Sequence, residues 1–185
     1  MRAIRVFALG AMTLLTVASC GGSETCKDAK DAHCESAPLR ARGTFTPKAG
    51  GSLSGSVELV QRGGVVTLIA DLKGAPPGPH GVHIHETGDC SAPDFSSAGG
   101  HFNPTGAPHA CPPTVPRHAG DLGNTVIDAD GKGHVQIETD LFTLTPGERS
   151  VAGRALILHH DADDCAGQPT GHSGDRIACA VIRLE

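Results

Sequence analysis

The sequence is divided into short β-type segments, and it has no amphipathic repeat long enough for an ordinary helix. Residues 52–60 alternate polar or small positions with apolar ones, and residues 65–72 form a second run rich in β-branched side chains. Glycine, proline and aspartate separate further apolar runs at residues 82–85, 125–128, 134–139, 155–158 and 177–184. Short strands punctuated by turn residues predict an all-β domain, either a sandwich or a barrel.

Two stretches between the predicted strands are too long and too polar to be simple turns. Residues 87–122 are rich in glycine, proline, serine and histidine, and residues 160–176 are rich in aspartate, glycine and proline. Each stretch begins just after a strand that carries histidine. Because long ordered loops in a compact domain are usually functional, we expect the site of the protein in these two segments.

The N-terminal segment has the features of a bacterial export signal. Arg2 and Arg5 form a positive region, and the apolar run over residues 6–18 follows it. This run is shorter than the about 20 residues that a membrane-spanning helix needs. It ends in the sequence VASC at residues 17–20, which resembles the lipobox of bacterial lipoproteins. An ordinary signal peptide that is cut elsewhere is the alternative.

These features predict the organisation of the whole chain. We expect a signal peptide over 1–19, a lipidated Cys20 that opens a flexible tether over 20–40, and one folded domain over 41–185. The protein is then exported to the periplasm or the cell surface and held at a bacterial membrane by its lipid. Removing the two arginines of the signal from the 15 basic residues leaves 13 against 20 acidic ones. An acidic chain without basic clusters argues against nucleic-acid binding.

Six histidines and one aspartate lie near the predicted strand ends or in the first long loop. His83 and His85 alternate along one strand, so both rings face the same side of the sheet. The others are His101, His109, His118, Asp121 and His159. Isolated histidines would most simply be surface or core residues, but this clustering favours a site for one or two metal ions. Imidazole groups with one carboxylate suit copper and zinc.

Five segments of the chain resemble the copper/zinc superoxide dismutases in sequence and in order. They are GVHIHETGD at residues 81–89, SAGGHFNP at 97–104, RHAGDLGN at 117–124, GRALILH at 153–159 and GDRIACAVI at 174–182. The resemblance extends from about residue 41 to the end of the chain. It implies a Greek-key β-barrel or sandwich with a metal-binding loop and an electrostatic loop. It also implies that the protein converts superoxide to oxygen and hydrogen peroxide with a copper and a zinc ion.

The resemblance also implies a role for each site residue. Copper is held by His83, His85, His101 and His159, and zinc is held by His101, His109, His118 and Asp121. His101 bridges the metals and carries a proton, and Arg176 guides the anionic substrate, so these two are the expected catalytic residues. Asp163 matches a carboxylate that hydrogen-bonds one ligand of each metal. The loop over residues 163–176 lacks lysine, so guidance of superoxide is expected to depend mainly on Arg176.

An even number of cysteines besides Cys20 suggests disulfides in an exported protein. Cys90 and Cys179 match the disulfide of the family. If Asp163 bonds His109, a second bridge should join Cys111 to Cys165, because each cysteine lies two residues further along the chain. Two free thiols are the alternative to this bridge. The sequence leaves the pairing of Cys26 and Cys34 open.

Two other functions compete with the enzyme. A protein of the same fold could store or deliver copper or zinc, and a β-domain could serve adhesion without any metal. The chain retains all seven ligand residues and Arg176, whereas inactive relatives usually lack ligands, so the enzyme is favoured. Superoxide is the expected partner, and membrane contact is expected only through the lipid. The sequence does not decide between a monomer and a homodimer.

Overall fold

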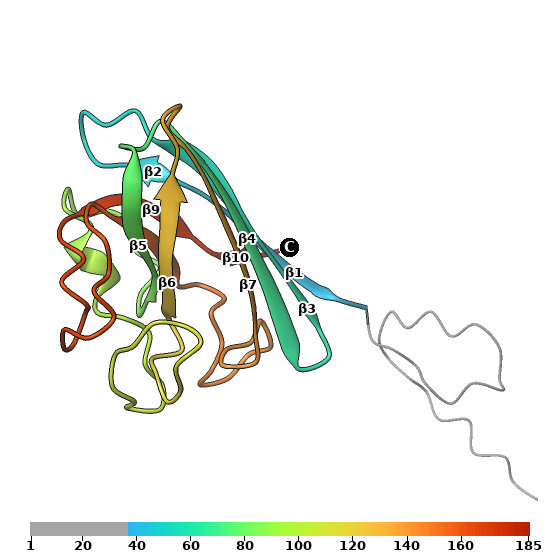
Figure 1. Ribbon diagram of the computed structural model, residues 1–185. Coiled ribbons are helices and arrows are strands. Elements are labelled where there is room, and N and C mark those ends of the chain that lie inside the picture. Colours follow the sequence, from blue (N-terminus) through green and yellow to red (C-terminus); the bar gives the residue numbers. More distant parts are fainter. Residues whose placement is uncertain (1–36) are drawn as a thin grey trace, which may run out of the picture. The chain divides into compact units, whose positions relative to one another are not determined.

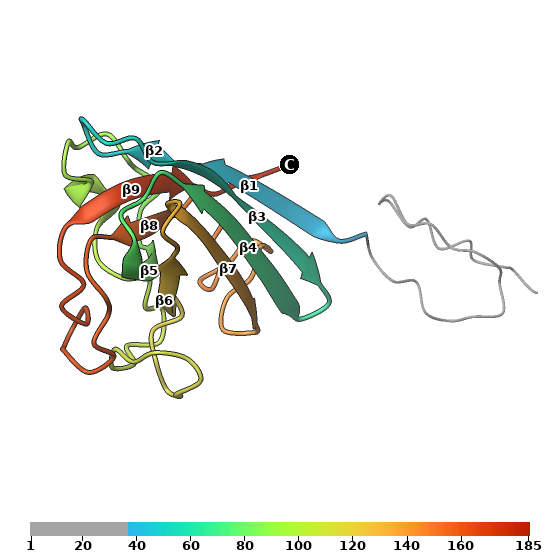
Figure 2. The same ribbon diagram turned by 45° about the horizontal axis from the view of Figure 1, so that its top comes forward.

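The computed structural model describes residues 37–185 of the chain. The predicted signal peptide, the predicted lipidation site Cys20 and the cysteines Cys26 and Cys34 lie outside these residues. The described part folds into two antiparallel sheets of five strands each, which face one another as two layers (Figures 1 and 2). Within residues 37–185, no helix has the length and apolar character needed to cross a bilayer. The predicted all-β class is confirmed.

The two sheets have distinct strand orders. The first sheet runs in the order β10-β1-β3-β4-β7, and the second in the order β2-β9-β8-β5-β6. The first contains β1 (Leu39–Thr44), β3 (Ser54–Arg62), β4 (Val65–Lys73), β7 (Lys132–Thr139) and β10 (Arg183–Leu184). The second contains β2 (Thr46–Pro47), β5 (Gly78–His85), β6 (Asp121–Ile127), β8 (Ala155–His159) and β9 (Arg176–Val181).

Each predicted run overlaps one or two of these strands, but the bounds differ: β5 begins at Gly78 and β6 at Asp121, each four residues before its predicted run. The structure also shows β1 and β2, which lie before the first predicted run, and β1 begins two residues before the expected start of the folded domain at residue 41. The last apolar run, 177–184, is divided between β9 and β10, which belong to different sheets. The single helical turn in the described residues is the 3-10 helix η1 (Ser96–Ala98) in the first long loop.

Alternation of polar and apolar side chains builds the first sheet. On β3 and β4 the inward residues are fully buried, and Leu59 lies directly opposite Leu68 in the register of the two strands. The two strands are joined at Gly63, where φ is +55°, a conformation that glycine adopts without a steric penalty. The inward side chains of both sheets form one hydrophobic core. This core holds the two sheets together and supports the loops.

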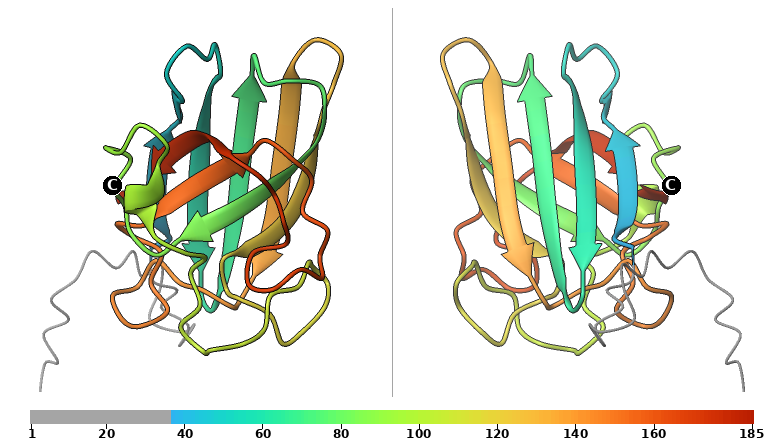
Figure 3. Two further views of the ribbon diagram at one scale, coloured as in Figure 1. Left: turned by 90° about the vertical axis from the view of Figure 1, so that its left-hand side faces the viewer. Right: turned by 90° about the vertical axis from the view of Figure 1, so that its right-hand side faces the viewer.

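The second sheet differs because its interior strands are buried on both faces. Val82 and Ile84 of β5 face the core between the sheets. His83 and His85 alternate with them and therefore point to the outer face of the sheet. The long loops over residues 86–120 and 160–175 lie around this outer face, as the left view of Figure 3 shows, and both histidines are fully buried. The fold thus places two strand histidines between a rigid sheet and two loops.

Candidate metal centre

Four histidine rings converge at the ends of β5 and β8. His83 and His85 come from β5, and His159 is the last residue of β8. The backbone of His101, in the first long loop, pairs with that of His85 in a single antiparallel β-bridge. One ring nitrogen from each of the four lies within 4.8 Å of the others. Nε2 of His85 and Nε2 of His159 are 3.3 Å apart. This is the arrangement in which four imidazole nitrogens can share one metal ion.

A second group of four ligands surrounds one carboxylate oxygen. Oδ1 of Asp121 lies 2.9 Å from Nδ1 of His101, 3.1 Å from Nδ1 of His109 and 3.2 Å from Nδ1 of His118. Tetrahedral zinc with bonds of about 2.0–2.1 Å has ligand atoms about 3.3 Å apart, close to these separations. The other oxygen, Oδ2, accepts hydrogen bonds from the backbone amides of Ala110 and His118 at 3.1 and 3.2 Å. Oδ1 is thereby directed at the ion site.

Unpaired ring nitrogens show that metal ions fit both groups. Among the described residues, four buried nitrogens have no hydrogen-bond partner: Nδ1 of His83, Nε2 of His101, Nδ1 of His109 and Nδ1 of His118. A buried polar atom without a partner costs about 1–3 kcal/mol. Each of the four nitrogens belongs to one of the two ligand groups, and the ligand atoms of a group lie around one point. A metal ion at each of the two points gives these nitrogens a partner. His101 contributes one nitrogen to each group.

Asp163 connects the two groups through their outer nitrogens. Its Oδ2 lies 2.7 Å from Nε2 of His83, and its Oδ1 lies 3.0 Å from Nε2 of His109. Asn124 holds the backbone of Asp163 at two points, because its Nδ2 donates to the carbonyl at 2.9 Å and its Oδ1 accepts from the amide at 2.7 Å. Asn124 lies within a segment that the sequence analysis recognised, but its role as a support for Asp163 was missed.

The remaining ring orientations are fixed by backbone carbonyls. Nδ1 of His85 donates to the carbonyl of Gly99 at 2.9 Å, which leaves Nε2 free as a ligand atom. Nδ1 of His159 lies 3.3 Å from the carbonyl of Gly174. The carbonyl of His159 in turn accepts from the buried ring of His80 at 2.8 Å. Each ring is therefore held in the tautomer that metal binding needs.

Burial keeps three residues of the four-histidine group neutral. It lowers the pKa of His83 to about 4, although the hydrogen bond with Asp163 partly offsets the effect. Burial also lowers the pKa of His85 to about 2 and that of His159 to about 3. For Asp163, burial opposes ionisation, but hydrogen bonds led by the one from His83 outweigh it and lower the pKa to about 2. Neutral imidazoles beside an ionised carboxylate are the states that metal binding requires.

Arg176 lies beside the four-histidine group. It is the cross-strand partner of His159 in the pairing of β8 with β9. Its Nη1 donates to the carbonyl of Phe95 at 2.5 Å, and its Nη2 donates to the carbonyl of Gly99 at 2.6 Å. Burial lowers its pKa, but a guanidinium stays charged throughout the physiological range. The two bonds hold a fixed positive charge next to His159 of the four-histidine group.

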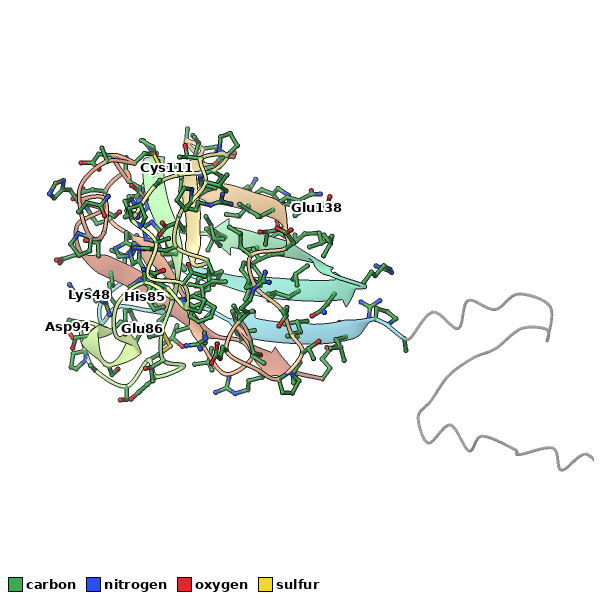
Figure 4. All side chains as sticks on the ribbon, turned by 90° about the horizontal axis from the view of Figure 1, so that it is seen from below. Lys48, His85, Glu86, Asp94, Cys111 and Glu138 are labelled. Atoms are coloured by element: carbon green, nitrogen blue, oxygen red, sulfur yellow. A yellow bond between two sulfur atoms is a disulfide. The ribbon has the colours of Figure 1, made fainter. Side chains whose placement is uncertain are left out.

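Two disulfides fasten the loops that cover the site. Cys90 is joined to Cys179 of β9, and Cys111 is joined to Cys165, each with an S–S distance of 1.98 Å. Cys111 and Cys165 therefore form a disulfide, and the alternative of two free thiols is wrong. In Figure 4, His85 and Cys111 lie on the loop-covered part of the domain, whereas Glu138 of β7 lies away from it. The sulfur atoms are bonded to each other, so they form no metal site with Asp163.

The fold and the site together define a class of protein. A β-sandwich that holds a four-histidine group beside a group of three histidines and one aspartate, with one histidine in common, is the scaffold of a dinuclear metalloprotein. The model of the family described as copper/zinc superoxide dismutase (SODC) matches residues 53–182. The chain belongs to the copper/zinc superoxide dismutase family.

Individual relatives agree with this membership. The chain is 40% identical over 138 residues to superoxide dismutase (Cu-Zn) 2 of Aquifex aeolicus, covering 72% of this chain and 81% of the relative. It is 36% identical over 143 residues to the extracellular superoxide dismutase (Cu-Zn) of Brugia pahangi, covering 72% and 71%. A crystal structure of the clock protein EA4 superposes with a TM-score of 0.72 at 35% identity, covering 84% of this chain and all of that one.

Proposed function

We propose that the protein converts two superoxide ions and two protons into one molecule of oxygen and one of hydrogen peroxide. One superoxide ion is oxidised and the other is reduced. The observation that carries this proposal is the shared residue His101, whose two ring nitrogens face two different ligand groups. When bound, copper supplies the one-electron exchange with superoxide, and zinc supplies a fixed positive charge without redox chemistry.

The two ligand groups support an assignment of the residues to two metals, with His101 shared between them. Copper is held by His83, His85, His101 and His159, and zinc by His101, His109, His118 and Asp121. The zinc assignment is supported by the carboxylate ligand and by the near-tetrahedral separations around its Oδ1. The copper assignment is supported by four neutral imidazoles, which are ligands that copper favours.

His101 and Arg176 perform the steps that involve substrate and protons. Nε2 of His101 has no hydrogen-bond partner among the described residues, so it can take up a proton when it is not coordinated and give it to the reduced product. The guanidinium of Arg176 is fixed by two backbone carbonyls beside His159, so it can hold the anionic substrate there without reorganising. Asp163 keeps the rings of His83 and His109 in place during both half-reactions.

Metal storage or delivery on the same fold is the competing function, and the site does not favour it. A store must release its metal, whereas these ligands are buried and tied to the sheet through Asp163 and two disulfides. A store also has no use for a fixed cation such as Arg176 beside the copper ligands.

The rate of superoxide loss after loading with copper and zinc tests the proposed function. Fast copper-dependent loss that is absent from the apo protein and from a His159→Ala variant supports the enzyme. Tight binding of both metals with no activity above that of free copper contradicts it and favours storage or delivery.

We further propose that the protein is exported and lipid-anchored. The proposal rests on the VASC sequence that ends at Cys20 and on the two disulfides of the domain, which persist in oxidising compartments. A relative of the chain is named as extracellular. In this arrangement residues 1–19 are removed, and the tether that begins at Cys20 ends before β1 (Leu39–Thr44), the first strand of the enzyme domain. Incorporation of labelled fatty acid into the wild-type protein, and its loss from a Cys20→Ser variant, would support the anchor; equal labelling of both would contradict it.

A further inference from the structure

The zinc-side ligand His109 lies in a segment that has no regular secondary structure of its own. No strand or helix contains residues 102–120, although His109 is only 3% exposed. Buried backbone amides and carbonyls need hydrogen-bond partners, and a strand or helix would normally supply them. The partners of His109 therefore have to come from elsewhere in the fold.

A single side chain from the other loop supplies both partners. Oε1 of Gln168 accepts a hydrogen bond from the backbone amide of His109 at 2.9 Å, and Nε2 of Gln168 donates to the carbonyl of His109 at 2.9 Å. The two residues are 59 positions apart in the sequence. The side-chain amide of Gln168 thus takes the place that a neighbouring strand would occupy.

The same loop also holds the ring of His109 and the chain that follows it. Asp163 faces Nε2 of the ring, and the disulfide from Cys165 fastens Cys111, two residues after His109. The amide of Cys165 donates to Oδ1 of Asp163 at 2.7 Å, so the disulfide and the carboxylate form one unit. Gly171 has a φ of +68°, and a Cβ at this position would clash with Oδ1 of Asp163 and with Nε2 of His109. The two loops are therefore packed closely around this ligand.

We propose that Gln168 and the Cys111–Cys165 disulfide form a clamp that positions His109 and limits the rate at which zinc leaves the site. The proposal rests on the proposed function, because it takes His109 as a zinc ligand. Zinc can leave only when its ligands open, and a loop with few contacts of its own opens readily. The clamp replaces the missing local contacts with the two hydrogen bonds of Gln168 and the disulfide from Cys165, all from the opposite loop. Gln168 is thus a positioning residue for the zinc site.

The clamp predicts a selective loss of zinc. Of the four copper ligands, His83, His85 and His159 stand on strands or strand ends, and the side chain of Gln168 makes no hydrogen bond to any of these three. Removing the clamp should therefore accelerate zinc release by roughly tenfold, in line with the 10–100-fold effects of residues that support metal ligands. Copper release should change much less. A general loss of stability would instead accelerate the release of both metals.

The experiment follows the transfer of zinc and copper from the loaded protein to excess chromogenic chelators. Gln168→Ala and the double variant Cys111→Ser with Cys165→Ser should release zinc roughly tenfold faster than the wild type. Gln168→Glu keeps the acceptor for the amide of His109 but loses the donor to its carbonyl. Its rate of zinc release should therefore lie between that of the wild type and that of Gln168→Ala. Gln136→Ala changes an exposed glutamine on β7 and should release zinc at the wild-type rate.

A spectroscopic signature separates positioning from general stability. With cobalt in the zinc site, the visible absorption bands should shift in Gln168→Ala but not in Gln136→Ala, because only the first frees the backbone of His109. If the double serine variant does not fold, the two Gln168 variants still decide the question. Zinc release at the wild-type rate from both, with unchanged cobalt spectra, would overturn the clamp. A wild-type protein that binds copper but no zinc would overturn the zinc assignment itself, and the clamp with it.

Discussion

Nζ of Lys48 lies 2.8 Å from Oδ2 of Asp175, the residue that directly precedes Arg176. The backbone amide of Lys48 also donates to the carbonyl of Ile177 at 2.9 Å, so the lysine is held beside the start of β9. Figure 4 shows Lys48, Asp94 and His85 toward the same side of the domain. The electrostatic loop has no lysine, but the tertiary structure brings one to it from the connection between β2 and β3.

This ion pair makes a prediction about substrate attraction. Without Lys48, the carboxylate of Asp175 next to Arg176 would repel an incoming superoxide ion. We expect Lys48→Ala to lower the second-order rate constant roughly twofold at low ionic strength, and the difference to shrink as salt screens the charges. Pulse radiolysis over a series of salt concentrations measures this. Lys132→Ala removes a lysine of the β6–β7 hairpin paired with Asp130 and should have no such effect; equal rates for Lys48→Ala and wild type at low salt would contradict the prediction.

The link between the metals through Asp163 can be broken with a small change. Asp163→Asn keeps the shape of the side chain but replaces one acceptor oxygen by a donor nitrogen, so His83 or His109 loses its hydrogen bond. We expect the affinity for the affected metal to fall by about 10–100-fold, as measured by competition with a chelator. Asp161→Asn, two residues earlier on an exposed side chain, is the matched control. Wild-type affinity for both metals in Asp163→Asn would show that the bridge does not tune the site.

Arg176→Lys tests whether fixed geometry matters beyond charge. Lysine keeps the positive charge but cannot donate from two nitrogens of one plane to the carbonyls of Phe95 and Gly99. We expect the rate constant for superoxide to fall by roughly threefold to tenfold while both metals stay bound. Stopped-flow or pulse-radiolysis rates on metal-analysed protein measure the effect, with Arg183→Lys on β10 as the control. An unchanged rate would mean that charge alone guides the substrate.

The lowered histidine pKa values predict how the apo protein responds to acid. In the fold, the pKa of His83 is about 4 and that of His159 is about 3, against 6.5 as the ordinary value. Between pH 6.5 and these values, the unfolded chain binds more protons than the folded one, so the free energy of unfolding falls as the pH falls. We expect the Tm of the apo protein to drop by several degrees from pH 7.5 to pH 5.0.

Thermal unfolding followed by circular dichroism checks this dependence. His134→Ala should not reduce this fall in Tm, because that ring is exposed and its pKa is raised by the hydrogen bond with Asp71, so it opposes the fall instead of contributing to it. A Tm that stays constant over this pH range in the wild-type apo protein would contradict the prediction.

Local patterns in the sequence were sufficient for the fold class and for the approximate positions of the longer strands after residue 52. Alternation of apolar residues along β3 and β4 follows from the two-residue period of a strand, which needs no knowledge of the partner strand. The start of β1 was missed because its first two residues, Leu39 and Arg40, are both exposed and show no alternation. The short β2 carries only Thr46 and Pro47, which is too little pattern to detect.

The residues proposed as metal ligands could be named from the sequence because their types and spacings resemble a known family. The relative positions of these residues and the ring nitrogens that they leave free could not be predicted in this way. Strand register makes Arg176 the cross-strand neighbour of His159 and places His83 opposite Asp121. Which ring nitrogen is free follows from acceptors such as the carbonyl of Gly99, and a backbone carbonyl leaves no mark in the sequence.

The sequence by itself therefore determined the all-β class and the chemical set of candidate ligands, since both depend on residue type and local spacing. The tertiary structure decided between the expected Cys111–Cys165 disulfide and two free thiols, and it alone revealed the hold of Gln168 on His109 and the approach of Lys48 to Asp175. Each of these joins residues more than 50 positions apart. The physical reason is that such contacts depend on how the loops pack against the sheet, and loop packing has no period that a sequence could display.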